Sequence, residues 1–193
     1  MKWLLCDYGE VLAMAPSPAD RAALEVEIGA DVSDFWARYW QHRPAYDRGD
    51  LDTAGYWSLA LKYAPRPIPL RRLVELDTIM WSRPNQASLD ATSRAAARGV
   101  KLAVLSNAPA ELADSFNQLP WLAPFDPRLF SGHLGAIKPE PRIYAMALAA
   151  LNAEPEDVSF IDDRPENIRA ASRAGLHATL FRSAGQIDNI YPP

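Results

Sequence analysis

Cysteine is almost absent from this chain, which has one such residue, Cys6, among 193. A disulfide within the chain is therefore excluded, and a zinc site built from several thiolates is not expected. Cys6 lies in an apolar run, and we interpret it as a small buried hydrophobic side chain, with a catalytic thiol a distant alternative.

Basic residues are not in excess either. The chain has 20 Lys and Arg against 24 Asp and Glu, so its formal net charge is −4. This balance argues against nucleic acid and against a polybasic membrane contact as partners. Apolar runs are all too short for a membrane span or a signal peptide, so we expect a cytoplasmic protein with no membrane partner.

Hydrophobic residues make up 49% of the sequence, which is enough for a full core in one large domain, with or without an insertion. Short apolar runs predict strands, separated by stretches of helical character. The predicted strands are Lys2–Cys6, Lys101–Ser106, Asp157–Ile161 and His177–Phe181, with a weaker one near Arg128–Ser131. The predicted helices are Arg83–Arg98, Pro109–Leu119, Pro139–Asn152 and Pro165–Ala174. This alternation predicts an α/β fold with a mostly parallel sheet and helices on both faces.

The segment after the first strand breaks the alternation, because some ninety residues pass before the next one. Helix-like stretches begin in it at Ser17, at Ser33, near Asp52 and at Pro69, and their apolar residues recur at helical spacing. We therefore predict an inserted helical bundle over residues 15–82 and an α/β core over residues 1–14 and 83–193.

Asp7 is the most informative single residue. It follows the apolar run Lys2–Cys6 directly and precedes Tyr8 and Gly9, which is typical of a buried strand that ends in a carboxylate and a turn. The carboxyl ends of parallel strands form the edge at which open α/β sheets bind ligands. A carboxylate there can act as a nucleophile or bind a hard cation such as Mg²⁺.

Other predicted strand ends carry complementary polar residues, namely Ser106-Asn107, Lys138 and Asp162-Asp163. Carboxylates suit Mg²⁺, hydroxyl and amide groups suit phosphate oxygens, and a lysine suits an anion beside a nucleophile. Each of these groups also has an ordinary structural interpretation: Ser106-Asn107 as a turn, Lys138 as a solvated surface lysine, and Asp162-Asp163 as a helix N-cap. The doubled aspartate resists that interpretation most, because adjacent like charges at a buried strand end repel one another unless a cation compensates them.

Together, these motifs resemble those of the haloacid dehalogenase superfamily, in the same order and over nearly the whole chain. The segments that carry the resemblance are Asp7–Leu12, Leu105–Asn107, Lys138–Tyr144 and Phe160–Ile168. The resemblance is greatest to the branch with a small helical cap, which includes the phosphatase domain of soluble epoxide hydrolase and sugar-1-phosphatases. It implies a Rossmann-like core, and the insert at 15–82 as the cap.

The resemblance also implies a role for each motif. Asp7 would be the nucleophile that takes the phosphoryl group, and Lys138 would neutralise charge between Asp7 and the phosphate. Ser106 and Asn107 would bind phosphoryl oxygens. The implied Mg²⁺ ligands are Asp7, the carbonyl of Gly9, Asp163, and Asp162 either directly or through water, with Asn167 ordering metal-bound water or substrate.

Gly9 departs from the pattern of most phosphatases in this superfamily, which carry an aspartate there as general acid and base. General acid–base catalysis typically contributes about 10²–10⁴-fold, so a substrate with a good leaving group would suffer least from this change. Glu10 is the nearest alternative carboxylate, although a turn residue facing solvent is the preferred interpretation of it.

The predicted cap is rich in aromatic residues, which we interpret mainly as its own core, with a few facing a substrate cleft. Arg43 and Arg48 flank a predicted turn, Pro44–Asp47. Arg43 is a candidate to bind an anionic group of the substrate, with an ion pair to Asp47 or Asp50 an equal alternative.

The sequence thus predicts a Mg²⁺-dependent phosphatase that acts on a small phosphorylated metabolite, as a monomer or a homodimer. A 2-haloacid dehalogenase is the first alternative, since it would also use Asp7, and Lys138 and Tyr144 have a spacing seen in dehalogenases. The second is a phosphate-binding or partner-binding protein that lost turnover through Gly9.

Overall fold

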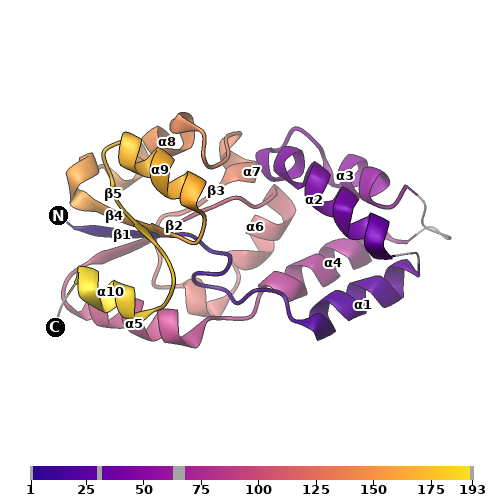
Figure 1. Ribbon diagram of the computed structural model, residues 1–193, viewed down its shortest axis with the longest axis horizontal. Helices are drawn as coiled ribbons and strands as arrows, with labels where there is room; N and C mark the ends of the chain where they lie inside the picture. Colours follow the sequence, from indigo (N-terminus) through magenta and orange to yellow (C-terminus); the bar gives the residue numbers. More distant parts are fainter. Residues whose placement is uncertain (1, 30–31, 63–67, 192–193) are drawn as a thin grey trace.

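A parallel β-sheet forms the centre of the larger part of the molecule in the computed structural model, which describes residues 2–29, 32–62 and 68–191 (Figure 1). In the described residues the sheet has five strands in the order β3-β2-β1-β4-β5. The strands are β1 (Trp3–Cys6), β2 (Lys101–Ser106), β3 (Arg128–Phe130), β4 (Val158–Asp162) and β5 (His177–Leu180). The predicted α/β fold is confirmed, and each strand lies within one or two residues of its prediction.

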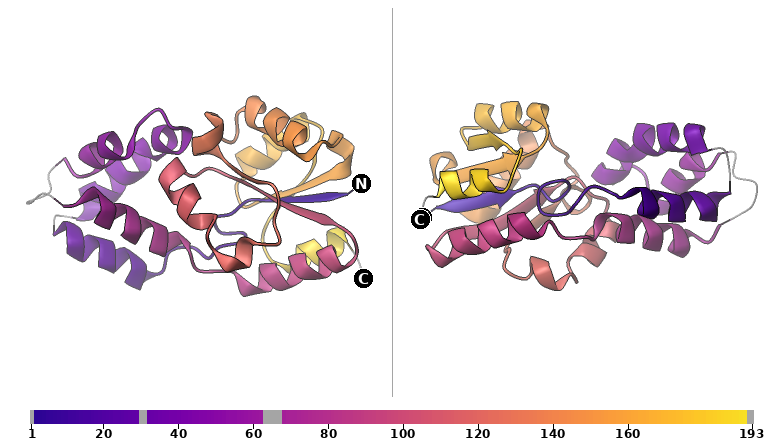
Figure 2. Two further views of the ribbon diagram at one scale, coloured as in Figure 1. Left: turned by 180° about the vertical axis from the view of Figure 1, so that it is seen from behind. Right: turned by 60° about the horizontal axis from the view of Figure 1, so that its bottom comes forward.

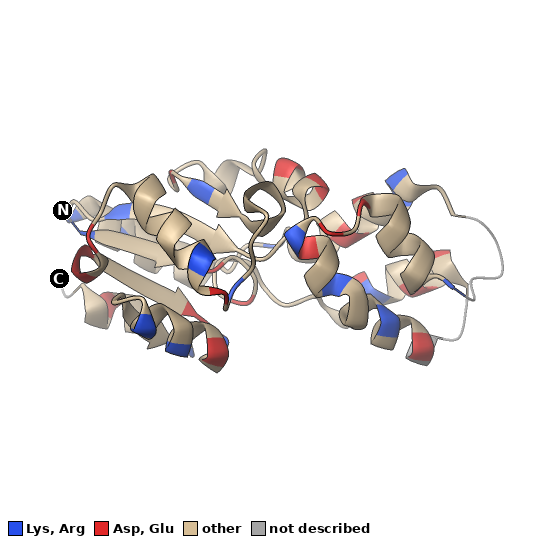
Figure 3. Cartoon of the chain, turned by 90° about the horizontal axis from the view of Figure 1, so that it is seen from above, with Lys and Arg blue, Asp and Glu red and all other residues tan. Residues whose placement is uncertain are grey.

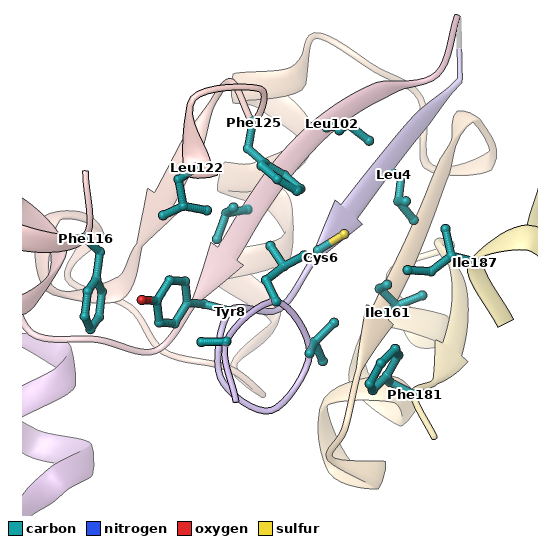
Figure 4. Packing of buried hydrophobic residues seen from close by; sticks show 14 of the residues in the cluster. Leu4, Cys6, Tyr8, Leu102, Phe116, Leu122, Phe125, Ile161, Phe181 and Ile187 are labelled. Atoms are coloured by element: carbon teal, nitrogen blue, oxygen red, sulfur yellow. The ribbon is translucent and has the colours of Figure 1, made fainter. Parts of the chain in front are cut away.

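Alternate residues of β1 point to opposite faces of the sheet, and each face has its own hydrophobic cluster. Leu4 and Cys6 pack on one side, with residues of α5 (Gln86–Ala97), α6 (Ala110–Phe116) and α10 (Gly185–Ile190) (Figure 4). Trp3 and Leu5 pack on the other side, against α8 (Pro141–Leu151) and α9 (Pro165–Arg173). The sheet is therefore covered on both faces, as a parallel sheet requires.

The order of the strands places a topological switch point between β1 and β4. From β1 the chain moves outward to β2 and β3, and it then returns to the opposite side of β1 to form β4 and β5. Cys6 is in register with Val104 of β2 and with Ile161 of β4, so these three strands end at about the same level. A ligand site is expected just beyond them.

The segment between β1 and β2 contains α1 (Pro18–Ile28), α2 (Val32–Arg48), α3 (Thr53–Ala60) and α4 (Leu70–Trp81), which lie together at one end of the molecule (Figures 1 and 2). We call these helices the cap. Their buried side chains form a hydrophobic cluster separate from those on the sheet. Most of the aromatic residues predicted for the core of the cap are buried there, including Phe35, Tyr39, Tyr46, Tyr56 and Trp57.

One prediction about the second cap helix is wrong. The helix begins at Val32, one residue before the predicted start at Ser33, but the predicted turn Pro44–Asp47 belongs to its last part. Pro44 has no N–H to donate and its ring crowds the preceding turn, yet the helix continues beyond it. The ring of Tyr46 there stacks on Tyr56 with centroids 4.2 Å apart, which favours this continuation.

Two neighbouring chain segments connect the cap to the sheet. Met14 N–H donates to the carbonyl of Arg83, and Asn85 N–H donates to that of Leu12, both at 2.8 Å. The predicted helix start at Arg83 is therefore three residues early, because residues 83–85 pair with residues 12–14, which lead from β1 into the cap. None of the helices that the structure describes has the length and apolar character needed to span a membrane.

Further short elements complete the described chain. They are α7 (Ser131–Leu134) and single turns of 3₁₀ helix at Pro120–Leu122 and Pro155–Asp157. Helix α7 packs against α2 of the cap and thereby places the end of α2 above the loop that follows β2. This contact brings cap residues to the edge of the sheet where the polar residues meet.

Candidate active site

The structure brings the polar residues of the predicted motifs together at one edge of the sheet. Asp7 follows β1, Ser106 ends β2, and Asp162 ends β4, with Lys138 in the loop before α8. All four side chains are at least nine-tenths buried. Together with the neighbouring Asn107 and Asp163, all but Asp162 line a cavity of about 620 Å³ between the sheet and the cap. That volume is typical of a small-molecule site.

Lys138 connects two of the carboxylates. Its Nζ lies 2.7 Å from Asp7 Oδ1 and 2.7 Å from Asp162 Oδ2, and its side chain is 1% exposed. The position of Lys138 is fixed by its own backbone: Asn107 Oδ1 accepts from its N–H at 2.8 Å, and Asn107 Nδ2 donates to its carbonyl at 2.9 Å. Asn107 thus fixes the backbone of Lys138, and the two carboxylates hold its ammonium group beside Asp7.

Both carboxylate oxygens of Asp162 are occupied by hydrogen bonds. Oδ1 accepts from the backbone N–H of Arg164 and from Asn167 Nδ2, both at 2.9 Å, while Oδ2 accepts from Lys138 Nζ at 2.7 Å and Asn167 Nδ2 at 3.0 Å. Each oxygen has two lone pairs, so the partners account for all four positions. Asp162 therefore holds Lys138 and Asn167 in place.

The site carries more negative than positive charge. Burial raises the pKa of Asp7 well above its ordinary value, and although the Lys138 ammonium opposes this rise, Asp162 adds to it. Burial also raises the pKa of Asp163, and Asp162 and Glu10 raise it further. Burial alone would lower the pKa of Lys138, yet the carboxylates of Asp162 and Asp7 outweigh it and raise that pKa.

These residues fit a divalent cation. The carboxylate oxygens of Asp7, Asp162 and Asp163 lie within 4.8 Å of one another. Three carboxylates against the one ammonium of Lys138 leave an excess of two negative charges, which a divalent cation would neutralise. Asp7 Oδ2 accepts no hydrogen bond from any residue that the structure describes. Because the oxygens of Asp162 are already used, Asp7 and Asp163 are the carboxylates open to direct ligation.

Ser106 and Asn107 lie at the end of β2, which neighbours β1 on the side away from β4. Ser106 is 4% exposed and lines the cavity. The side chain of Asn107 is used by the backbone of Lys138, so an interaction of Asn107 with phosphate would fall to its main-chain N–H. Phosphate binding by these two residues stays a prediction.

Gly9 and Glu10 form the turn after Asp7. A Cβ added at Gly9 would lie 3.5 Å from the ring of Trp81, so a longer side chain at position 9 would run along that ring. Glu10 has a φ of 58°, in the left-handed region, and it is exposed at the cavity lining. A non-glycine residue in that region is uncommon and is often found at functional sites.

The cap supplies the other wall of the cavity through Trp40, Arg43, Pro44, Asp47 and Trp81. Arg43 lines the cavity as the sequence predicts, but its guanidinium is already engaged. Nε lies 2.6 Å from Asp47 Oδ1, and Nη1 lies 3.2 Å from Asp77 Oδ2. The structure thus shows the ion pair with Asp47, which is one of the two interpretations that the sequence offers for Arg43, and Arg48 pairs with Asp50 at 3.0 Å.

Sequence reasoning missed Asp47, Trp40 and Trp81 as cavity residues. Arg43 and Asp47 are four residues apart, a spacing that brings two side chains together on a helix, so recognising the helix would have selected Asp47 over Asp50 as the partner of Arg43. Nothing in the sequence distinguishes Trp40 and Trp81 from the buried aromatic residues of the cap.

Known proteins resemble this chain in sequence and in fold. The family model for haloacid dehalogenase-like hydrolases matches residues 11–175. The phosphoserine phosphatase of Thermus thermophilus is 37% identical over 83 residues, which is 42% of this chain and 33% of that protein. Bifunctional epoxide hydrolase 2 of Rattus norvegicus is 41% identical over 58 residues, or 30% of this chain and 10% of that protein. The chain thus spans a third or less of these relatives.

The fold likeness extends over the whole chain. A crystal structure of the HAD family enzyme bt-2542 from Bacteroides thetaiotaomicron superposes with a TM-score of 0.81, covering 100% of this chain and 99% of that one at 15% identity. At that identity the likeness concerns the fold alone, whereas the family model spans most of the sequence. This chain belongs to the haloacid dehalogenase-like hydrolases.

Proposed function

We propose that this hydrolase is a Mg²⁺-dependent phosphatase that removes phosphate from a small phosphorylated metabolite through an aspartyl-phosphate on Asp7. The observation that carries the proposal is the position of the Lys138 ammonium, 2.7 Å from Asp7 Oδ1 and inside the cavity. A buried cation beside a carboxylate nucleophile suits a substrate whose reacting group is itself anionic.

In the proposed reaction, Asp7 Oδ2 attacks phosphorus while the bond from phosphorus to the leaving oxygen breaks. Lys138 offsets the charge of both Asp7 and the phosphoryl oxygens, and Ser106 binds one of those oxygens. Water then attacks the phosphorus of the aspartyl-phosphate, which releases inorganic phosphate and regenerates Asp7. When bound, Mg²⁺ would be held by Asp7, the carbonyl of Gly9 and Asp163, and it would neutralise phosphoryl charge.

The relatives support phosphate ester chemistry, because one of them is named as a phosphoserine phosphatase. The geometry supports one further part of the proposal. Residues 15–82 would act as a cap over the site, since α2 and α4 line the cavity. The protein would work in the cytoplasm as a monomer or a homodimer.

A 2-haloacid dehalogenase is the alternative that shares the nucleophile. In this structure, however, the hydroxyl of Tyr144 donates to the carbonyl of Asn167 at 3.0 Å and so supports the Asp162 hydrogen-bond network. The excess negative charge around Asp163 would also have no use in a dehalogenase, which needs no metal. Both observations favour the phosphatase.

Hydrolysis of para-nitrophenyl phosphate tests the proposal, because its aryl leaving group needs little protonation and Gly9 should not hide the activity. We expect turnover with Mg²⁺, none above background with EDTA, and a loss of at least about 10³-fold in Asp7→Asn. Asp50→Asn, an exposed change elsewhere in the cap, is the matched control and should keep full activity. Release of chloride from 2-chloropropionate, without phosphatase activity, would select the dehalogenase. Tight phosphate binding without turnover of either compound would select the binding protein.

A further inference from the structure

The cap wall of the cavity carries a buried cluster of charges. Tyr39, Arg43 and Asp47 come from α2, and Asp77 comes from α4. The side chains of Arg43, Asp47 and Asp77 are 9%, 10% and 0% exposed. Figure 3 shows that acidic and basic residues are spread over the cap helices. Arg43, Asp47 and Asp77 are instead buried, and Arg43 and Asp47 line the cavity.

Two nitrogens of Arg43, Nε and Nη1, are used within this cluster. The guanidinium lies 2.6 Å from Asp47 and 3.2 Å from Asp77, and its Nη1 donates to the hydroxyl of Tyr39. That hydroxyl in turn donates to Asp77 Oδ1 at 2.7 Å. Two carboxylates against one guanidinium leave the cluster with one excess negative charge. A second anion on the substrate would therefore meet a cluster that is already negative, and drawing the guanidinium away from its carboxylates would leave a buried charge without its partner, which is strongly unfavourable.

Asp47 is the member of the cluster that is open to a ligand. Its Oδ1 accepts from Arg43 Nε, whereas Oδ2 accepts no hydrogen bond within the described part of the chain, and the residue lines the cavity. Burial raises the pKa of Asp47, while Arg43 opposes this rise. A buried carboxylate oxygen with unused lone pairs is suited to a hydrogen-bond donor.

The position of Asp47 is fixed against the catalytic edge of the sheet. Its carbonyl accepts from Ser131 Oγ at 2.5 Å, and the same Oγ accepts from the N–H of Ala108, next to Asn107, at 2.9 Å. These hydrogen bonds hold the main chain of Asp47 against the loop that follows β2, next to the residues proposed to bind phosphate. Beside it, the ring of Trp40 is about half exposed and meets Trp81 edge-on with centroids 6.3 Å apart. These rings offer an apolar surface to C–H groups.

The remaining charges around the cavity do not provide a site for a second anion either. Arg164 lines it from the loop after β4, but its guanidinium is paired with Glu166. Lys138 is turned to Asp7 and Asp162. Glu10 and Asp163 add negative charge at the same lining. Among the described residues that line it, the cavity thus offers acceptors and no cation without a carboxylate partner.

We propose that Asp47, oriented by Arg43, selects the leaving group of the substrate: a group with a hydroxyl or ammonium donor and without a second anionic group. This inference rests on the proposed phosphatase function and names its substrate class. Both kinds of leaving group would donate a hydrogen bond to Asp47 Oδ2. Polyhydroxylated and amino-substituted phosphate esters both meet this requirement.

The test compares kcat/KM for a set of esters of matched length: propyl, 3-hydroxypropyl, 3-aminopropyl and 2-carboxyethyl phosphate. We expect the hydroxyl or the amino ester to exceed propyl phosphate by about tenfold, and the carboxylate ester to fall below it by about tenfold or more. The hydroxyl and amino arms distinguish the two sources of the donor. In Asp47→Asn, the ratio of amino to carboxylate ester should fall by at least about tenfold, whereas Asp50→Asn should leave the ratio unchanged.

A wild-type enzyme that hydrolyses the carboxylate ester as well as propyl phosphate would overturn the inference, and so would an unchanged ratio in Asp47→Asn. The wild-type series decides the matter by itself if Asp47→Asn fails to fold. Turnover of para-nitrophenyl phosphate separates the two proposals. When it is present, a failed ester series removes only the substrate class, and when it is absent, both proposals fail.

Discussion

At the scale of single residues, Lys138 is held between two carboxylates that have different tasks. Asp7 keeps one oxygen free of hydrogen bonds from the described chain, while Asp162 has all its acceptor positions filled. A nucleophile must present an unused lone pair, and a positioning group need not. Hydrogen bonding thus distinguishes the roles of the two aspartates, although both are buried and both lie 2.7 Å from the ammonium group of Lys138.

This difference predicts separate effects at the doubled aspartate. Asp163→Asn should weaken Mg²⁺ binding by about 10–100-fold, because it removes a charged oxygen that is open to the metal. Asp162→Asn should change Mg²⁺ affinity much less but lower kcat by about 10–100-fold, because an amide cannot hold both Lys138 and Asn167. Calorimetric titration of Mg²⁺ measures the first quantity, and para-nitrophenyl phosphate turnover at saturating Mg²⁺ measures the second. Equal loss of Mg²⁺ affinity in both variants would contradict the assignment.

At the scale of elements, local signals fix where α1 begins. Ser17 Oγ accepts from the N–H of Asp20 at 3.2 Å, and Asp20 Oδ2 accepts from the N–H of Ser17 at 2.8 Å, which together form a capping box. Pro18 occupies the first turn. The helix packs on α4, so its start sets one edge of the cap.

Ser17→Ala should lower the free energy of unfolding by about 1 kcal/mol, which corresponds to a fall in Tm of about 2–4 °C for a chain of this size. Ser172→Ala is the matched control: Ser172 is exposed on α9, and we expect Tm within about 1 °C of the wild type because alanine is the better helix former. Differential scanning calorimetry gives both values. A fall of similar size in the control would remove capping as the explanation.

The elements also show what sequence reasoning can reach. The strands, the helices between them and the chemistry at the strand ends follow from short apolar runs and the polar residues that end them. The turn predicted at Pro44 is wrong because proline usually ends a helix, whereas α2 continues beyond it and Tyr46 packs on Tyr56. The partner of Arg43 depended on that helix. Helix α7 has four residues, too few to show a periodic pattern.

At the scale of the whole molecule, the cavity lies between two bodies that have separate hydrophobic clusters. Chain segments near Leu12 and Asn85 connect them, and Ser131 joins the end of α2 to the loop after β2. Charge is concentrated between these bodies, since the carboxylates of Asp7, Asp163 and Asp47 all face one cavity. Folding gathers like charges that are far apart in the unfolded chain, and stability should therefore depend on what neutralises them.

The pKa values of Asp7 and Asp163 are raised in the folded protein. A carboxyl group with a raised pKa contributes stability that is present below its unfolded pKa, near 4, and is lost as pH rises through the folded value. Asn at position 7 mimics the protonated form and avoids this loss. In EDTA, Asp7→Asn should therefore have a higher Tm than the wild type, by an amount that grows as the pH is raised from about 4 to about 7.

Carboxylates with lowered pKa values, such as Asp188 beside Arg94, respond to pH in the opposite direction, so the difference between variants is informative and the wild-type curve alone is not. Asp188→Asn is the control, and its Tm should not rise above that of the wild type as the pH increases.

Mg²⁺ at about a hundred times its Kd should add about 2.7 kcal/mol to the free energy of unfolding of the wild type, which corresponds to a rise in Tm of about 5–11 °C. The gain should be smaller in Asp7→Asn, because the charge that the metal neutralises has already been removed. If Asp7→Asn is instead less stable than the wild type in EDTA at pH 7, then Lys138 alone compensates the site, and the case for a divalent cation is lost.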